Sequence, residues 1–250
     1  MQNIYEIILL IGAGIFAGFA NTVAGGGSLL TLPILIFMGL PPAVANGTNR
    51  IAIVVSTLSA SIGYASKRVI TYPFSIYLGI SALFGAILGA RIAIDIDGGI
   101  FNRILAIIMI VVVLIIAFKP NISNHLSQER TTGKHLLISL VAFFFIGIYG
   151  GFINAGIGFI IMLYLNTFNR MNLVRVNSVK VGVAFIYTVG ALVTFALSGN
   201  VNWIYGFIMA IGTSFGAWAG SRLSVDKGEG FIKLFLIVIV IFMSIKLWFS

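Results

Sequence analysis

The chain has 250 residues, of which 60% are hydrophobic and 8% are charged, and its mean hydropathy is +1.12. Soluble globular domains carry roughly 25% charged residues, so this composition excludes a soluble enzyme and a disordered protein. The absence of cysteine excludes a disulfide scaffold. Fifteen Lys and Arg residues against six Asp and Glu residues give a net charge of +9. In a membrane protein such cations mark loops, so nucleic acid is not an expected partner.

Apolar runs separated by polar residues predict ten helical segments, because no strand-like alternation occurs and lipid-exposed backbone must satisfy its own hydrogen bonds. In chain order these segments are roughly 4–22, 28–40, 46–66, 73–92, 101–118, 135–153, 158–168, 177–197, 203–222 and 231–249. The segments 28–40 and 158–168 are too short to span a bilayer, and each follows a glycine cluster. About eight transmembrane segments are therefore expected, since a span needs roughly 20 residues.

The two halves of the chain share a sequence pattern. Gly85–Arg91 returns 131 residues later as Gly216–Arg222, and the same shift relates Asn46 to Asn177. We therefore expect a duplicated chain with a first repeat at 1–118, a linker at 119–134 and a second repeat at 135–250. The three regions would form one transmembrane domain.

The distribution of cations distinguishes parallel repeats from inverted ones. If 4–40 and 135–168 are re-entrant hairpins, each repeat crosses the membrane three more times, and eleven cations lie on one face against four on the other. Parallel repeats divide the same cations about nine to six, which is a weaker positive-inside bias. The expected fold is an all-α integral membrane protein with two inverted-topology repeats, each a glycine-broken helical hairpin plus three transmembrane helices. Both termini would lie outside and the linker in the cytoplasm.

Polar residues gather at the two glycine breaks. Inverted repeats with glycine-broken helices point to a secondary transporter with its substrate site at the repeat interface. Half-helices that begin near Ser28 and Phe159 would direct their positive ends at an anion there. The candidate substrate-binding residues are Asn21, Gly25, Gly26, Gly27, Ser28, Asn46, Thr48 and Asn49 in the first repeat and Asn154, Gly156, Gly158, Asn177, Ser178 and Lys180 in the second. Candidate counter-charge or gating residues are Arg50, Arg91 and Arg222.

Each of these signals has a structural alternative. The spaced glycine pairs Gly14/Gly18, Gly85/Gly89, Gly147/Gly151 and Gly216/Gly220 fit close helix packing better than a site. Asn46 and Asn177 are alternatively helix N-caps. Arg91 and Arg222 fit helix ends that cap carbonyls or reach the interface. Lys180 is alternatively a loop cation.

Several kinds of chemistry are not expected. All six acids lie in termini or loops, so a proton relay of buried carboxylates has no residues to use. Ser28 follows two glycines, as a nucleophile could, but no buried base accompanies it. We therefore expect no catalytic residue, no metal site, no cofactor and no enzymatic activity.

The glycine-rich pattern resembles the sulfite exporter TauE/SafE family, which also includes toluene-sulfonate uptake permeases. The resemblance rests on Ala17-Gly18-Phe19, Gly25-Gly26-Gly27-Ser28, Pro33, Ala45-Asn46-Gly47-Thr48 and Gly85-xxx-Gly89-Ala90-Arg91. It covers essentially the whole chain, although Phe159 replaces Ser28 in the second repeat.

The resemblance implies a bacterial or archaeal plasma-membrane carrier, a monomer or homodimer in the lipid bilayer, that exports sulfite or a related organosulfonate by alternating access. The expected seat of the anion lies between the two hairpin tips. The alternatives are a carrier for another small anion or solute and a membrane scaffold without flux.

Overall fold

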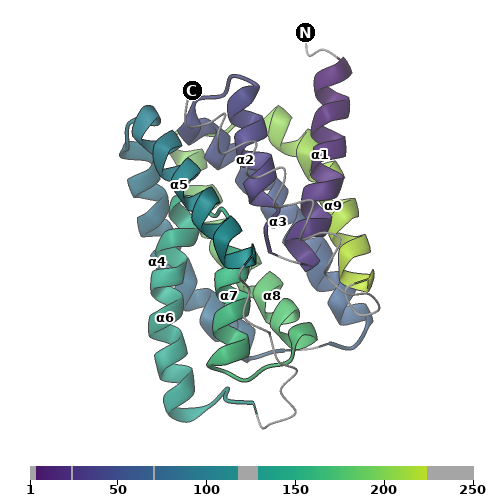
Figure 1. Ribbon diagram of the computed structural model, residues 1–250, viewed down its shortest axis with the longest axis vertical. Coiled ribbons are helices and arrows are strands. Elements are labelled where there is room, and N and C mark those ends of the chain that lie inside the picture. Colours follow the sequence, from purple (N-terminus) through teal and green to yellow (C-terminus); the bar gives the residue numbers. More distant parts are fainter. Residues whose placement is uncertain (1–3, 24, 70, 118–128, 224–250) are drawn as a thin grey trace.

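The structure is a computed structural model that describes residues 4–23, 25–69, 71–117 and 129–223, and in these ranges every regular element is a helix (Figure 1). The helices are α1 (Ile4–Val23), α2 (Ser28–Phe37), α3 (Pro42–Ser66), α4 (Phe74–Asp95), α5 (Gly98–Ala117), α6 (Gly133–Phe152), α7 (Ile157–Thr167), α8 (Leu173–Leu197) and α9 (Trp203–Leu223). The prediction of an all-helical protein is confirmed. The tenth predicted segment, 231–249, and the linker residues 119–128 lie outside the described residues.

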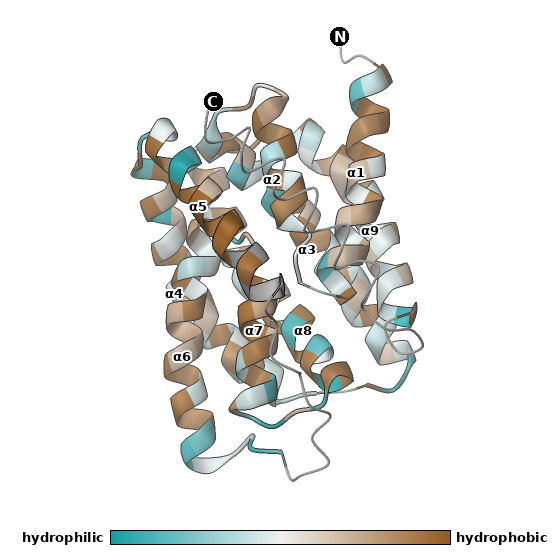
Figure 2. Ribbon diagram, in the orientation of Figure 1, coloured by the Kyte–Doolittle hydropathy of each residue, from teal (hydrophilic) through white to brown (hydrophobic). Residues whose placement is uncertain are grey.

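The outer surface of the described helices is apolar, as a bilayer requires. Four helices, α1, α4, α6 and α8, are long and apolar enough to cross a membrane. Large side chains such as Ile8, Val141 and Phe215 are exposed on this surface. Figure 2 shows hydrophobic residues along the length of α1, α4 and α6, with hydrophilic residues gathered toward the helix ends. Exposed apolar surface of this extent is stable in contact with lipid and not with water.

Two helical hairpins are broken where glycine was predicted to break them. The chain turns after α1 at Gly25, whose φ is +83°, and after α6 at Asn154 and Gly156, whose φ values are +57° and +69°. Positive φ is cheap for glycine and tolerable for asparagine. In Figure 1, α1 descends and α2 returns upward, whereas α6 ascends and α7 returns downward, so the two turns lie at the same level.

The helix starts of α3 and α8 differ from the sequence prediction. α3 begins at Pro42 instead of 46, because proline has the φ that a first helical position requires. Its missing N–H costs nothing there, since an N–H at this position has no partner within the helix. α8 begins at Leu173 instead of 177, because the side chain of Asn172 caps the helix by accepting from the Arg175 N–H at 3.0 Å. Asn46 and Asn177 therefore lie one turn inside their helices. Their alternative interpretation as N-caps is wrong.

The spaced glycine pairs pack helices together. A Cβ on Gly14 would lie 2.7 Å from the Met209 carbonyl oxygen, and one on Gly18 would overlap the backbone of Thr213, so α1 meets α9 backbone to backbone. Gly85, Gly89, Gly147 and Gly151 bring α4 and α6 together in the same way. The packing interpretation of these pairs is confirmed, as small-xxx-small spacing predicts.

This packing predicts opposite effects at two glycines of α1. We expect Gly18→Ala to destabilise the protein by about 1–3 kcal/mol, because the added methyl group meets backbone that cannot move aside. Gly12→Ala is the matched control: nothing lies within 4 Å of its added Cβ, and alanine favours the helix by up to about 1 kcal/mol. Thermal unfolding in detergent measures both. Equal unfolding midpoints for the two variants would contradict the packing.

Candidate functional site

An arginine and an asparagine of α3 cap the end of α6. Arg50 is fully buried and donates from Nη1 to the Gly150 carbonyl at 2.6 Å and from Nη2 to the Gly151 carbonyl at 2.8 Å. Asn46 Nδ2 donates to the Phe152 carbonyl at 2.7 Å, and its Oδ1 accepts from Arg50 Nη2 at 2.9 Å. The last carbonyls of a helix have no partner within the helix. Arg50 and Asn46 supply those partners at the tip of the second hairpin.

A lysine of α8 makes the corresponding contact with α1, and an asparagine of α8 holds that lysine. Lys180 is 3% exposed, and its Nζ donates to the Thr22 carbonyl at 3.0 Å, in the last turn of α1. The same Nζ donates to Asn177 Oδ1 at 2.7 Å and lies 3.6 Å from Met162 Sδ. The alternative interpretation of Lys180 as a loop cation is wrong, because the side chain is buried at the tip of the first hairpin.

The two hairpin tips touch each other. A Cβ on Gly25 would lie 2.6 Å from the Gly158 Cα, and the Phe159 ring lies over Gly26. Ser28 Oγ donates to the Asn154 carbonyl at 2.9 Å, and Asn154 Nδ2 donates back to Ser28 Oγ at 3.2 Å. The expected seat directly between the tips is therefore filled by the protein's own backbone in this conformation.

A small polar cavity lies beside the first tip, between the α1–α2 hairpin and helices α3 and α9. Its volume of about 10 Å³ suits about one water molecule. The polar lining comes from Asn21, Ser28, Thr31, Asn49, Ser56 and Thr213, and the rest from Ala17, Gly18, Gly27, Ala52 and Ile53. Of these, Asn49 is 1% exposed, and neither Nδ2 nor Oδ1 has a hydrogen-bond partner among the described residues. A buried amide without partners costs about 1–3 kcal/mol for each unmade bond, which makes Asn49 a candidate for contact with a bound molecule.

The structure distributes the sequence-predicted residues over several roles. The cavity is lined by Asn21, Gly27, Ser28 and Asn49. The hairpin ends are capped by Asn46, Arg50 and Lys180, the last of which is held by Asn177, and the tips are shaped or joined by Gly25, Gly26, Gly156, Gly158 and Asn154. Thr48 and Ser178 are not brought into the cavity. Thr48 Oγ1 accepts from the Asn202 N–H at 2.8 Å, and Ser178 Oγ donates to the Val69 carbonyl at 3.1 Å, so both anchor loops.

Arg91 and Arg222 lie exposed near helix ends. The guanidinium of Arg222 is 4.3 Å from the centre of the Trp218 ring. A cation stacked on an interfacial tryptophan is typical of a helix end at the membrane surface. These positions fit an interfacial role and place neither arginine at the hairpin tips.

Sequence reasoning missed three cavity residues, Thr31, Ser56 and Thr213. Each hydroxyl donates to a backbone carbonyl: Thr31 to Gly27, Ser56 to Ile53, and Thr213 to Ala52 and Ala210. Serine and threonine often form such bonds within membrane helices, so their positions in the sequence carry no distinguishing signal.

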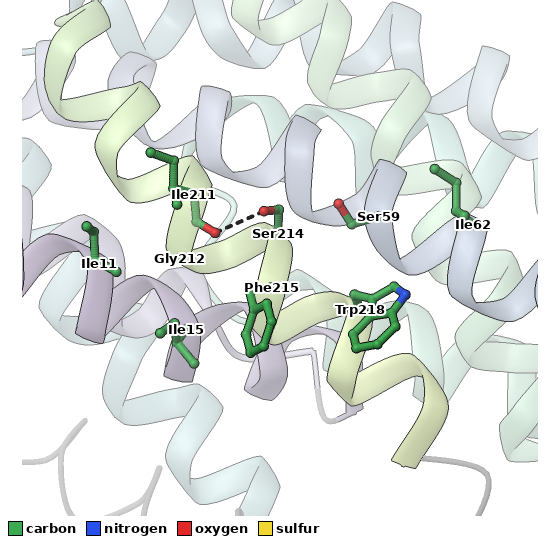
Figure 3. Close-up of a pocket in the computed structure, with 9 residues that line it drawn as sticks. All are labelled: Ile11, Ile15, Ser59, Ile62, Ile211, Gly212, Ser214, Phe215 and Trp218. Atoms are coloured by element: carbon green, nitrogen blue, oxygen red, sulfur yellow. Dashed lines mark hydrogen bonds between the residues drawn. The ribbon is translucent and has the colours of Figure 1, made fainter.

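A larger groove lies on the outer surface and differs in character from the cavity (Figure 3). It has a volume of about 510 Å³ and is lined mainly by apolar side chains of α1, α3 and α9, including the exposed Ile62, Ile211 and Phe215. Ser214 Oγ donates to the Ile211 carbonyl at 2.9 Å and Ser59 Oγ to the Val55 carbonyl at 2.9 Å. Its hydroxyls are thus satisfied within their own helices, and the groove faces the lipid side.

Comparison with known proteins supports a membrane transporter. The model of the sulfite exporter TauE/SafE family matches residues 10–247. The chain is 31% identical to the probable membrane transporter protein YfcA of Escherichia coli K12 over 97% of this chain and 91% of that one. A probable membrane transporter protein of Haemophilus influenzae is 30% identical over 96% and 94%, and YunE of Bacillus subtilis is 22% identical over 97% of each chain. The comparison with solved structures gives no match. The chain belongs to the sulfite exporter TauE/SafE family and is a multi-pass membrane transporter.

Proposed function

We propose that the protein carries a small sulfur oxyanion, sulfite or an organosulfonate, across the plasma membrane by alternating access, and that export is the driven direction. One observation carries the proposal: Arg50 is a fully buried cation whose described partners are the carbonyls of Gly150 and Gly151 and the amide of Asn46, all neutral. A buried charge is expensive unless something balances it. A mobile anion supplies that balance during each cycle.

The electrostatics of the hairpin tips favour an anion over a cation. The end of α6 carries about half a negative charge, which balances part of the Arg50 charge. The starts of α2 and α7 add positive partial charge at the same level. The acids among the described residues, Glu6, Asp95, Asp97 and Glu129, lie in the first or last turn of a helix or in a loop. The potential at the tips is thus positive, and it attracts oxyanions and repels metal cations and ammonium groups.

Matched contacts support the two inverted repeats. Asn46 and Arg50 of α3 cap α6, and Lys180 of α8, held by Asn177 Oδ1, caps α1, so each repeat caps the hairpin of the other. α1 packs on α9 as α6 packs on α4, and the two helices of each pair run parallel, whereas α1 descends and α6 ascends in Figure 1, so the two pairs run in opposite directions. An inverted pair with its site at the interface is the usual device for alternating access.

The charge distribution supports a cytoplasmic linker. Arg50 and Lys180 are buried and so do not count as loop cations. Each was assigned to a different face of the membrane, so each face loses one cation and the excess on the cytoplasmic face remains. The α3–α4 loop with Lys67 and Arg68, the start of α6, the α7–α8 loop and the end of α9 all lie at the lower end in Figure 1. The positive-inside rule assigns this end to the cytoplasm.

Ligand binding to the purified protein tests the substrate class. We expect sulfite, thiosulfate or a sulfonate such as sulfoacetate to raise the thermal unfolding midpoint in detergent, because a ligand bound to the folded state stabilises it by about 2.7 kcal/mol at 100 times its Kd. Choline and sodium ions at equal ionic strength serve as controls. Stabilisation by cations and not by anions would contradict the proposal. Stabilisation by no solute, together with no flux in liposomes, would favour a scaffold.

A further inference from the structure

We propose that the anion binds on one side of the pseudo-symmetric interface, in the cavity centred on Asn49, and that the equivalent position in the second repeat is a filled, non-binding plug. This inference rests on the proposed anion transport and names the side of the interface that holds the ligand. The proposed binding site is thus asymmetric and lies beside the first hairpin tip instead of between the two tips.

The unpartnered amide of Asn49 is the first observation. Asn49 lies in α3 directly before Arg50 and is one of the residues that line the cavity, and both of its amide atoms are buried without a described partner. Most buried polar atoms in proteins are hydrogen-bonded, and an exception calls for an explanation. An oxyanion would accept from Nδ2, while the neighbouring hydroxyls of Ser56 and Thr213 rotate from backbone carbonyls toward the anion's oxygens. The cavity lies beside the start of α2 at Ser28, whose helix dipole favours negative charge.

The second observation is that larger side chains stand at the equivalent positions of the second repeat. Under the shift of 131 residues, Ser28, Thr31, Ser56 and Asn49 correspond to Phe159, Met162, Tyr187 and Lys180. Tyr187 is fully buried, and its hydroxyl donates to Asn154 Oδ1 at 2.6 Å. Met162 is also buried and receives Lys180 Nζ on its sulfur. The space that is polar and open in the first repeat is therefore occupied by an aromatic ring and a thioether in the second.

The asymmetry also fixes how the site opens. The cavity holds about one water molecule here, so an oxyanion enters only when the α1–α2 hairpin moves away from α3 and α9. Lys180, whose Nζ contacts the Thr22 carbonyl at the end of α1, ties this hairpin to α8 in the closed conformation seen here. The ligand class that fits is a compact oxyanion with several acceptor oxygens, because the lining offers amide and hydroxyl hydrogens around a single small centre.

Single cysteines test the asymmetry directly, because the natural chain contains no cysteine. Ser56→Cys and Thr213→Cys place a thiol in the cavity, and Val183→Cys places one at the counterpart of the cavity residue Ala52. Ser59→Cys and Ser214→Cys are matched controls on the same two helices, since both residues face the outer groove (Figure 3). The probes are two methanethiosulfonates of similar size, one with an anionic sulfonate head and one with a quaternary ammonium head.

We expect both cavity cysteines to react with the sulfonate probe about tenfold or more faster than with the ammonium probe, because a positive site concentrates anions by this order. With the sulfonate probe, the Val183→Cys, Ser59→Cys and Ser214→Cys proteins should react at least about tenfold more slowly than the two proteins with a cysteine in the cavity. Equal labelling of Val183→Cys and the cavity cysteines would overturn the asymmetry. If the cavity cysteines were labelled by the sulfonate probe as slowly as the groove controls, or were labelled faster by the ammonium probe, the cavity would not be an anion site. Labelling needs no sulfite flux, so expected labelling without anion transport would reject the proposed function alone, whereas transport with symmetric or absent labelling would reject this inference alone.

Discussion

Replacement of Arg50 by methionine is expected to reduce anion flux in proteoliposomes to the protein-free background. The variant removes the buried positive charge and leaves the Gly150 and Gly151 carbonyls without their donors. Each lost charge-assisted hydrogen bond is worth about 1.5–3 kcal/mol. Stability should fall by less than the sum of these bonds, because removing a buried charge also removes its desolvation penalty.

Two further variants separate charge from shape at this position. Arg50→Lys keeps the charge but not the fork of two donors that spans neighbouring carbonyls, and we expect it to retain part of the flux. Arg103→Met removes an exposed arginine of α5 and should transport as the natural protein does. Flux of Arg50→Met at the natural rate, in a sample with an unchanged thermal midpoint, would show that Arg50 only caps α6.

Asn154 is expected to be the most sensitive position for the contact between the two hairpins. Its amide donates to Ser28 Oγ, accepts from the Tyr187 hydroxyl, and stands on a backbone with a φ of +57°. Asn154→Ala would leave two buried hydroxyls without these partners, at about 1–3 kcal/mol each, and would put alanine, which tolerates the left-handed region less well than asparagine does, at this positive φ, at a cost of about 1–2 kcal/mol. A fall in unfolding free energy of about 3–8 kcal/mol follows from these two effects.

Glycine at the same position separates the two effects. Asn154→Gly avoids the part of the stability loss that comes from the left-handed backbone, because glycine adopts positive φ without penalty. It restores neither of the two side-chain hydrogen bonds. We therefore expect the thermal midpoints to rank the natural protein highest, Asn154→Gly next and Asn154→Ala lowest. If Asn154→Ala melted above Asn154→Gly, the left-handed turn would not be a determinant of the tip.

The broken hairpins and the close helix pairs could be predicted from sequence because both depend on glycine, whose effects are local. Gly25 and Gly156 allow a positive φ that few other residues accept, and Gly18 permits a backbone contact with α9. Such signals are carried by a few neighbouring letters of the sequence. The starts of α3 and α8 were predicted one turn late, because Pro42 and Arg175 in their first turns interrupt the apolar runs used to delimit helices.

The partners of the polar side chains could not be predicted in the same way. Arg50 binds carbonyls about 100 residues away in sequence, and Lys180 binds one 158 residues away. Nothing in their immediate neighbours specifies those contacts, which arise only when the two hairpins meet. Asn46 and Asn49 likewise look alike in sequence, yet the first is fully engaged in capping and the second is unpartnered. The candidate cavity therefore becomes visible only with the packed helices.

Accumulation of sulfite in proteoliposomes under an imposed membrane potential tests the central claim most directly. A potential of 100 mV acts on a transported charge with about 2.3 kcal/mol, which corresponds to an accumulation ratio of about 50-fold for one negative charge. With the purified protein present, we predict that sulfite accumulates in the compartment held positive and is depleted when the sign is reversed. Accumulation that ignores the sign of the potential would contradict electrogenic transport, and no protein-dependent movement of sulfite, sulfonate or thiosulfate would contradict the account of an anion carrier.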